Sequence, residues 1–199
     1  MANASGKSLR RTSTLAIFSS IIAVLSVLGN FIHFGPFPIT LALAPIVIGA
    51  ALYGASAGAF LGGVFGVVTL ICGIFGWDGG AVLILLNASP FWLLVICIGK
   101  GIAAGWMAGL VYGFFEKKNS LLAVIAAGIV CPLTNTGIFV LGMYLFFRPT
   151  LTSWSGGTDT LSYIIFGLTG INFLVEVAVN MVLSSGITSI IKYGKGRRA

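Results

Sequence analysis

Long apolar runs, each of about 20 residues and almost free of charge, follow one another along the whole chain. A run of this length is what an α-helix needs to cross a bilayer. Only 8% of the 199 residues are charged and 58% are hydrophobic, whereas a soluble domain carries roughly 25% charged residues. The sequence therefore predicts an all-α integral membrane protein that forms a single transmembrane domain over residues 1–199.

Six apolar runs can be placed in the sequence. They lie near residues 12–30, 39–54, 56–75, 90–115, 120–147 and 160–191. The second run is short and almost touches the third, which predicts a tight helical hairpin. Glycines recur every four residues from the end of the second run into the third, and this spacing allows a close helix contact or serves ordinary packing; they are Gly54, Gly58, Gly62 and Gly66.

The basic residues indicate how the chain is oriented in the membrane. They gather in the N-terminal segment 1–11, at Lys117 and Lys118, and in the C-terminal tail 192–199. Lys and Arg are enriched in cytoplasmic segments. The pattern therefore predicts six spans with both termini in the cytoplasm, and it explains the net charge of +7 without a nucleic-acid partner.

Two longer connections are then expected outside the cell. One covers residues 73–90, is rich in glycine and contains Trp77 and Asn87, and the other covers residues 148–159. The first of them predicts a short re-entrant or interfacial piece. Because loops above a helical cavity commonly gate it, we count Trp77 and Asn87 among the candidate ligand contacts.

Two ionisable residues fall inside the predicted spans. Lys100 lies about ten residues from the outer start of the fourth span, roughly 15 Å deep at 1.5 Å per residue, and Glu176 lies midway along the sixth. Charged groups at this depth are costly and are functional candidates by default.

Further polar residues share this depth. In the sixth span Thr169, Asn172, Glu176 and Asn180 follow at intervals of three, four and four residues, which places them on one helix face. In the fifth span Asn135 and Thr136 lie about 12 residues from the outer end.

These residues suggest an outward-facing pocket. In that pocket Lys100 would meet an acidic ligand, and Asn135, Thr136, Asn172, Glu176 and Asn180 would supply hydrogen bonds. The alternative is that Lys100 and Glu176 pair with each other and that the amides join helices. Both arrangements are compatible with the sequence.

The first span carries a stripe of small residues on its cytoplasmic half. Ala16 and Ser20 are four residues apart, and Ser19 and Ala23 have the same spacing. Such a groove accepts a partner helix, although internal packing gives the same pattern.

No catalytic or metal-binding pattern is present in the sequence. There is no G-x-x-x-x-G-K-[ST] phosphate loop and no H-E-x-x-H or G-x-S-x-G motif. Cys72, Cys97 and Cys131 are isolated within apolar stretches, so neither a metal site nor a disulfide framework is indicated. The six spans also lack the inverted repeat typical of secondary transporters, so a transport function would need energy from a partner.

Three segments resemble a known family. FGPFPITLALAPIVIGAALYGASAGAFLGGVFGVV, CPLTNTGIFVLGMYLFF and INFLVEVAVNMVLSSGI are similar to the S components of energy-coupling factor (ECF) vitamin transporters, and the last two are closest to the pantothenate-type members. The resemblance covers nearly the whole chain. It implies a six-helix, non-enzymatic subunit of a bacterial plasma-membrane importer that captures a vitamin outside the cell.

The resemblance also implies partners. The subunit would dock on a transmembrane coupling protein and two ATPases, which use ATP and Mg²⁺, while this chain needs no cofactor. The family's docking motif on the first span falls on Ala16 and Ser20. The resemblance implies pantothenate as the first choice of cargo, with pyridoxine, hydroxymethylpyrimidine, folate and niacin as alternatives, and a non-transport membrane scaffold is the alternative from another class.

Overall fold

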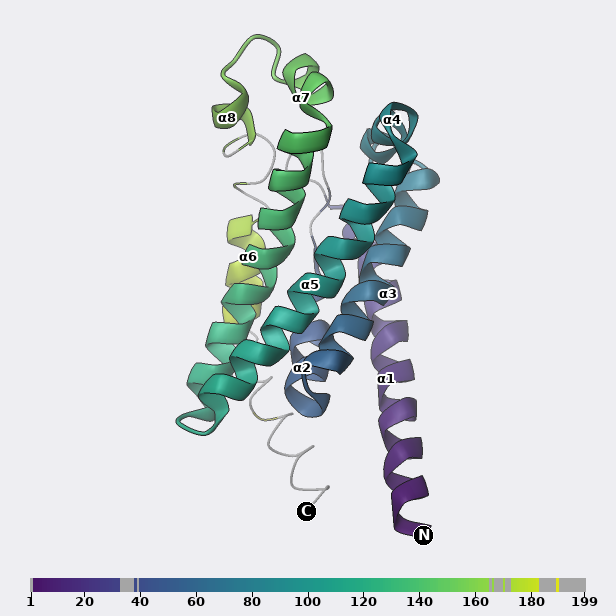
Figure 1. Cartoon of the computed structure of the whole chain (residues 1–199), viewed down its shortest axis with the longest axis vertical. Coiled ribbons are helices and arrows are strands. Elements are labelled where there is room, and N and C mark those ends of the chain that lie inside the picture. The colour runs from purple at the N-terminus through teal and green to yellow at the C-terminus, as the bar shows by residue number, and fades with distance from the viewer. Residues whose placement is uncertain are drawn as a thin grey trace.

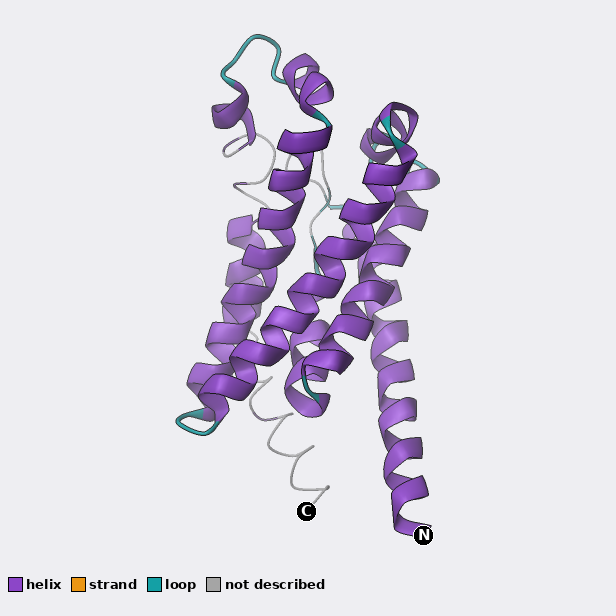
Figure 2. Cartoon of the chain, viewed as in Figure 1, coloured by secondary structure: helices purple, strands orange, loops and turns teal. Residues whose placement is uncertain are grey.

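The computed structural model describes residues 2–32, 38, 40–164, 166, 170, 173–182 and 189, with side chains omitted for 2–8 and 161. The secondary-structure elements of this part of the chain are helices (Figure 2). They are α1 (Ala2–Gly29), α2 (Leu43–Tyr53), α3 (Ala55–Ile74), α4 (Ala81–Ala88), α5 (Pro90–Glu116), α6 (Ser120–Phe146), α7 (Arg148–Trp154), α8 (Thr160–Ser162) and a further helix, Phe173–Val182.

Four of these helices are long and apolar enough to cross a membrane. They are Leu9–Gly29 within α1, and α3, α5 and α6. They match the first, third, fourth and fifth predicted spans to within a few residues. The second predicted span corresponds to the shorter helix α2, and the sixth contains the short α8 and the helix Phe173–Val182. The all-helical fold with four candidate membrane-spanning helices is thus confirmed for the described residues, while the count of six spans and the cytoplasmic position of both termini stay predictions.

Local sequence signals set several helix boundaries. Asn119 caps α6, because its side-chain oxygen accepts hydrogen bonds from the backbone N–H groups of Leu121 and Leu122 at 2.9 and 3.2 Å. Pro90 occupies the first turn of α5, where its missing N–H costs nothing. Gly54 alone separates α2 from α3 with φ of 87°, a conformation that favours glycine. The predicted hairpin is therefore present.

Helices α3 and α5 pack with their backbones in close contact. Gly58 and Gly62 of α3 face Gly105 and Gly101 of α5, so that a Cβ at any of the four positions would clash with the backbone of the facing glycine. Of the expected glycine series, Gly66 continues this contact against the backbone of Cys97, whereas Gly54 serves the turn. Helix α5 also packs extensively on α6, which makes it the central helix of the bundle (Figure 1).

The connections gather at the two ends of the bundle. In Figure 1 the start of α1 and the α5–α6 turn lie at one end, while α4 and α7 lie at the other. The short piece expected within residues 73–90 is helix α4. The expectation of a loop over residues 148–159 was partly wrong, because its first seven residues form α7. Pro149 suits the first turn of that helix, and burial of Leu151 anchors it.

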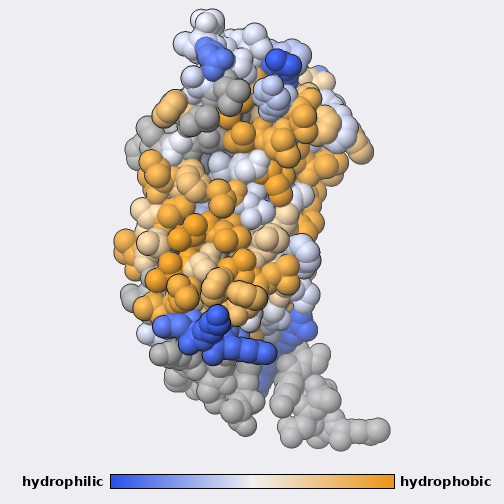
Figure 3. Space-filling model, turned by 60° about the vertical axis from the view of Figure 1, so that its left-hand side comes forward, coloured by the Kyte–Doolittle hydropathy of each residue, from blue (hydrophilic) through white to orange (hydrophobic). Residues whose placement is uncertain are grey.

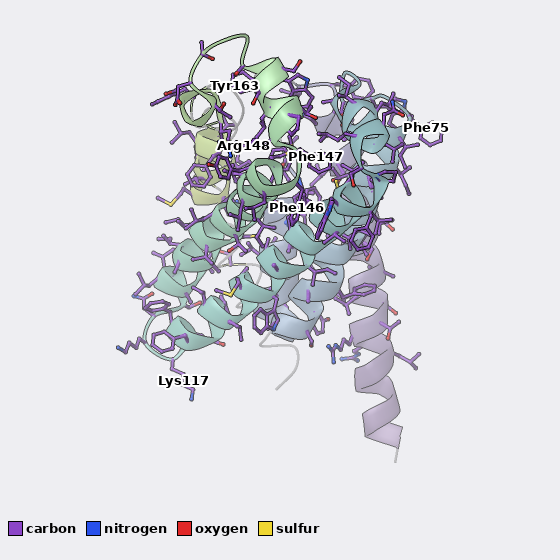
Figure 4. The ribbon with its side chains drawn as sticks, turned by 45° about the horizontal axis from the view of Figure 1, so that its top comes forward. Phe75, Lys117, Phe146, Phe147, Arg148 and Tyr163 are labelled. Atoms are coloured by element: carbon purple, nitrogen blue, oxygen red, sulfur yellow. The ribbon has the colours of Figure 1, made fainter. Side chains whose placement is uncertain are left out.

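The surface has the pattern of a membrane protein. Figure 3 shows apolar side chains over the middle of one face and hydrophilic side chains towards both ends. Lys117, in the α5–α6 turn, extends away from the helices at one end, and Arg148 lies at the other, next to Phe147 (Figure 4). This arrangement leaves a central zone suited to lipid.

Candidate functional site

A cavity lies between the helices on the side of α4 and α7. Its walls come from α1, α3, α4, α5, α6, the segment before α2 and the helix that carries Glu176. The cavity has a volume of about 90 Å³, whereas one water molecule needs roughly 10–15 Å³, so there is room for an organic molecule. The polar residues in the walls are Ser26, Asn30, Thr40, Thr69, Asp78, Lys100, Asn135, Thr136 and Glu176.

Lys100 lies in the cavity wall with its ammonium group between aromatic rings. Its Nζ is 4.9 Å from the ring centroid of Phe139 on α6 and 5.9 Å from that of Phe65 on α3. Aromatic faces attract a cation electrostatically. Phe65 lies on α3, Lys100 on α5 and Phe139 on α6, so the packing of these three helices positions the ammonium group.

Glu176 contributes a carboxylate to the same cavity. The residue is 4% exposed, and its Oε1 accepts a hydrogen bond from the backbone N–H of Thr40 at 3.2 Å. Among the described residues, no group hydrogen-bonds to its Oε2, and no ion pair joins it to Lys100. The structure thus brings Lys100 and Glu176 into one cavity without pairing them directly.

Asn135 and Thr136 also line the cavity, from α6. Asn135 is 4% exposed, and its Oδ1 has no hydrogen-bond partner in the described part of the chain. Four of the eight predicted ligand-binding residues therefore meet at one place. They are Lys100, Asn135, Thr136 and Glu176.

The other predicted ligand residues lie elsewhere. Asn180 is buried against Gly128 of α6 but is not part of the cavity wall. Trp77 and Asn87 are exposed at the two ends of the α4 region, and neither lines the cavity. Asn172 and the neighbouring Thr169 fall outside the described residues.

The cavity wall also contains polar residues that the sequence analysis did not select. Ser26 lies in α1 and Asn30 directly follows this helix, four residues on, and the Asn30 side-chain amide donates to the Ser26 carbonyl at 2.7 Å. Both are buried. Ser26 and Asn30 have the same four-residue spacing that marked the polar face of the sixth span. This spacing is the signal in the sequence that could have identified them.

Asp78 is another such residue, in the turn between α3 and α4, and Thr40 and Thr69 complete this set. Its carboxylate accepts hydrogen bonds from the backbone N–H groups of Gly80 at 3.1 Å and Val82 at 2.8 Å. It therefore caps the start of α4, whose Val82 and Leu85 form part of the wall.

The small-residue stripe of α1 faces away from the helical bundle. Ala16 and Ser20 are exposed and Ala23 is half-buried, while the Ser20 hydroxyl donates to the Ala16 carbonyl at 3.1 Å and so satisfies itself within the helix. A shallow apolar hollow lined by Ala23, Val24, Val27 and Leu28 continues the stripe. Contact of this face with a partner remains a prediction.

Comparison with known proteins identifies the family. The sequence matches the ECF transporter, substrate-specific component family over residues 13–191, a range that contains every residue of the cavity wall. It is also similar to the pantothenic acid transporter PanT of Lactococcus lactis subsp. cremoris (strain MG1363), with 30% identity over 187 residues, which cover 87% of this chain and 89% of that protein. The resemblance found in the sequence is confirmed, and the chain belongs to the family of substrate-specific components of ECF transporters.

Proposed function

We propose that this chain captures pantothenate from outside the cell as the substrate-binding subunit of an ECF importer. The observation that carries the proposal is the cavity inside the helical bundle, with a lysine held between aromatic rings in its wall. The similarity to a pantothenic acid transporter supports the choice of cargo. Pantothenate carries one carboxylate, two hydroxyl groups and one amide.

The chemistry of the wall suits such a ligand. The Lys100 ammonium would bind the carboxylate, because a charge-assisted hydrogen bond in a dry cavity is about twice as strong as a neutral one. Asn135 and Thr136 would hydrogen-bond the polar groups of the ligand, and the apolar wall from Leu93, Ile96 and Met143 would contact its methyl groups. This division follows the usual construction of small-molecule sites, which are apolar with a few placed polar groups.

Release of the cargo into the cell would depend on partners. The sequence has no phosphate loop of its own, so we propose that a transmembrane coupling protein and two ATPases supply the energy from ATP and Mg²⁺. The small-residue stripe of α1 is the proposed contact with the coupling protein. The expected location is the bacterial plasma membrane, with both termini in the cytoplasm.

Calorimetric titration of the detergent-purified chain, without partners, tests the proposal. The ligands are pantothenate, pyridoxine, hydroxymethylpyrimidine, folate, niacin and biotin. We expect sub-micromolar binding of pantothenate alone. Tight binding of another member of the panel would reassign the cargo, and absence of binding across the panel would contradict capture by the solitary chain.

Replacement of the cation tests the site. Lys100→Met keeps the length of the side chain and removes its charge, so affinity for pantothenate is expected to fall roughly 10- to 100-fold. Lys117→Met is the matched control, because Lys117 is exposed in the α5–α6 turn, and this variant should bind like the wild type. Equal affinity of the two variants would exclude Lys100 from the site.

A further inference from the structure

Three oxygen atoms in the cavity wall have no hydrogen-bond donor among the described residues. They are Ser26 Oγ of α1, Asn135 Oδ1 of α6 and Glu176 Oε2. The three residues are 8%, 4% and 4% exposed, and all three line the cavity. We call them the acceptor trio.

Unpartnered oxygens in buried positions are uncommon. Most buried polar atoms in folded proteins have a hydrogen-bond partner, and each exception calls for a physical reason. An oxygen that is taken out of water without a donor destabilises the protein. Of the five such oxygens in the described residues, three belong to residues of this cavity wall, where a ligand can supply the donors, while Ser19 Oγ and Asn180 Oδ1 lie outside the wall.

The other two charged groups of the wall, Asp78 and Lys100, have contacts within the protein. The Asp78 carboxylate already accepts the backbone N–H groups of Gly80 and Val82. The Lys100 ammonium lies over the rings of Phe139 and Phe65. The wall thus offers a ligand two kinds of contact, a cation for an acid group and the acceptor trio for donors.

We propose that the acceptor trio determines specificity, so that the cavity selects acids that also carry several hydroxyl or amide N–H groups. The inference rests on the proposed function and deepens it. Pantothenate has three such donors, two hydroxyls and one amide N–H, and the trio has three acceptors. An acid of similar size without these donors would bind the cation and leave the trio unsatisfied.

Glu176 is the strongest acceptor of the trio in its ionised form. An ionised carboxylate oxygen is an acceptor only, and hydrogen bonds to charged groups are stronger than those between neutral groups. Its Oε1 accepts the backbone N–H of Thr40, and its Oε2 has no donor among the described residues. Because Oε2 is almost fully covered, a rotation of the carboxylate must bring it to the ligand. A hydroxyl of the ligand that meets Oε2 should therefore contribute most to selectivity.

The test compares pantothenate with two analogues, in each of which one hydroxyl is replaced by hydrogen. Titration of the wild-type chain should show that at least one analogue binds roughly 10- to 100-fold more weakly. If both analogues bind the wild-type chain within about threefold of pantothenate, the inference is overturned without recourse to any variant. If pantothenate itself does not bind, the proposed function fails first and the inference fails with it.

Glu176→Gln assigns the selectivity to a residue. This variant keeps the shape of the side chain and an oxygen for the Thr40 N–H, and it removes the charge. It should weaken pantothenate binding roughly 10-fold or more while changing the affinity of the more discriminated analogue by less than about threefold. Ser26→Ala should behave in the same way with a smaller loss.

Asn180→Leu is the matched control for both variants. Asn180 is buried, its Oδ1 also lacks a donor within the described part of the chain, and it lies four residues from Glu176, but outside the cavity wall. Its replacement should change the affinities of pantothenate and of the analogues by the same factor. The inference is overturned if Glu176→Gln weakens all ligands equally, as the control does. It is also overturned if that variant tightens pantothenate binding. Repulsion between the carboxylates of Glu176 and pantothenate would then outweigh the hydrogen bond that Glu176 accepts from the ligand.

Discussion

The charge of Lys100 is held by aromatic rings and not by a carboxylate. Phe139 and Phe65 contact the cation from two different helices, while Glu176 is engaged by the backbone of Thr40. A lysine in an ion pair would have to give up its partner before it could bind an acidic ligand. Here no direct ion pair has to be broken before the cation binds an anion, which suits a site for an acidic ligand.

A single carboxylate, that of Asp78, controls the start of α4. Asp78→Asn replaces one acceptor oxygen by a donor, so that one of the N–H groups of Gly80 and Val82 loses its partner. Loss of a cap costs about 0.5–2 kcal/mol. Amide hydrogens of Ala81–Ala88 should therefore exchange roughly 2- to 30-fold faster, as measured by hydrogen exchange with mass spectrometry.

The matched control for this prediction is Asp159→Asn. Asp159 accepts hydrogen bonds from the backbone and hydroxyl groups of Ser162 at the start of α8, away from α4. Its replacement should leave exchange in α4 unchanged. Identical exchange of α4 in the wild type and in Asp78→Asn would show that packing alone holds this helix.

The sequence revealed the site residues whose polarity is costly at their depth. Lys100, Asn135 and Glu176 stand out in apolar runs for this reason. Ser26 does not stand out, because a serine in a transmembrane helix commonly bonds to its own backbone and is unremarkable. Asp78 falls in a segment predicted as a loop, and only the fold shows that its carboxylate turns back onto the next helix.

At the level of helices, the glycines of α3 act by their lack of a side chain. A methyl group at Gly62 would meet the carbonyl of Gly101, and the two helices would have to separate. Gly62→Ala is therefore expected to lower stability by about 1–3 kcal/mol. Thermal unfolding of the protein in detergent measures the loss.

Gly63→Ala provides the comparison at the neighbouring position. A methyl group there approaches only the side chain of Ile102, at 3.4 Å, and this side chain can adjust. The variant should unfold at nearly the wild-type temperature. If both variants were equally stable, the close approach of α3 and α5 would not contribute to stability in the way proposed.

The four-residue glycine spacing indicated a close contact but not its partner. Periodicity along one helix gives the face and leaves open which helix covers it. The structure supplies α5, whose own glycines at positions 101 and 105 lie opposite. Similarly, α7 was missed because a short polar segment with a proline satisfies the criteria for a loop and those for a first helical turn.

At the level of the whole molecule, the boundaries of the four long helices were predictable because each is an apolar run between polar or glycine-rich segments. The shorter α2 does not reach the length of a usual span. How the helices surround a cavity could not be predicted from the sequence, because that depends on contacts between residues far apart in the chain.

Association with the transporter partners should depend on the small-residue stripe of α1, which faces away from the helical bundle. Ser20→Leu places a large side chain at an exposed position of the small-residue stripe and should prevent copurification with the coupling protein and the ATPases. Pantothenate binding by the solitary chain should be unchanged. Ser20→Ala keeps the residue small and should still assemble, whereas normal assembly of Ser20→Leu would rule out this face as the contact.

The close contact of α3 and α5 has a consequence for how such proteins diversify. Lys100 directly precedes Gly101, whose main chain rests on that of Gly62. A contact between main chains does not depend on which amino acids surround it. Substitutions elsewhere around the cavity can thus reshape what surrounds the charge without displacing it, so descendants of this protein that bind other acids are expected to keep Lys100 as the proposed anchoring point.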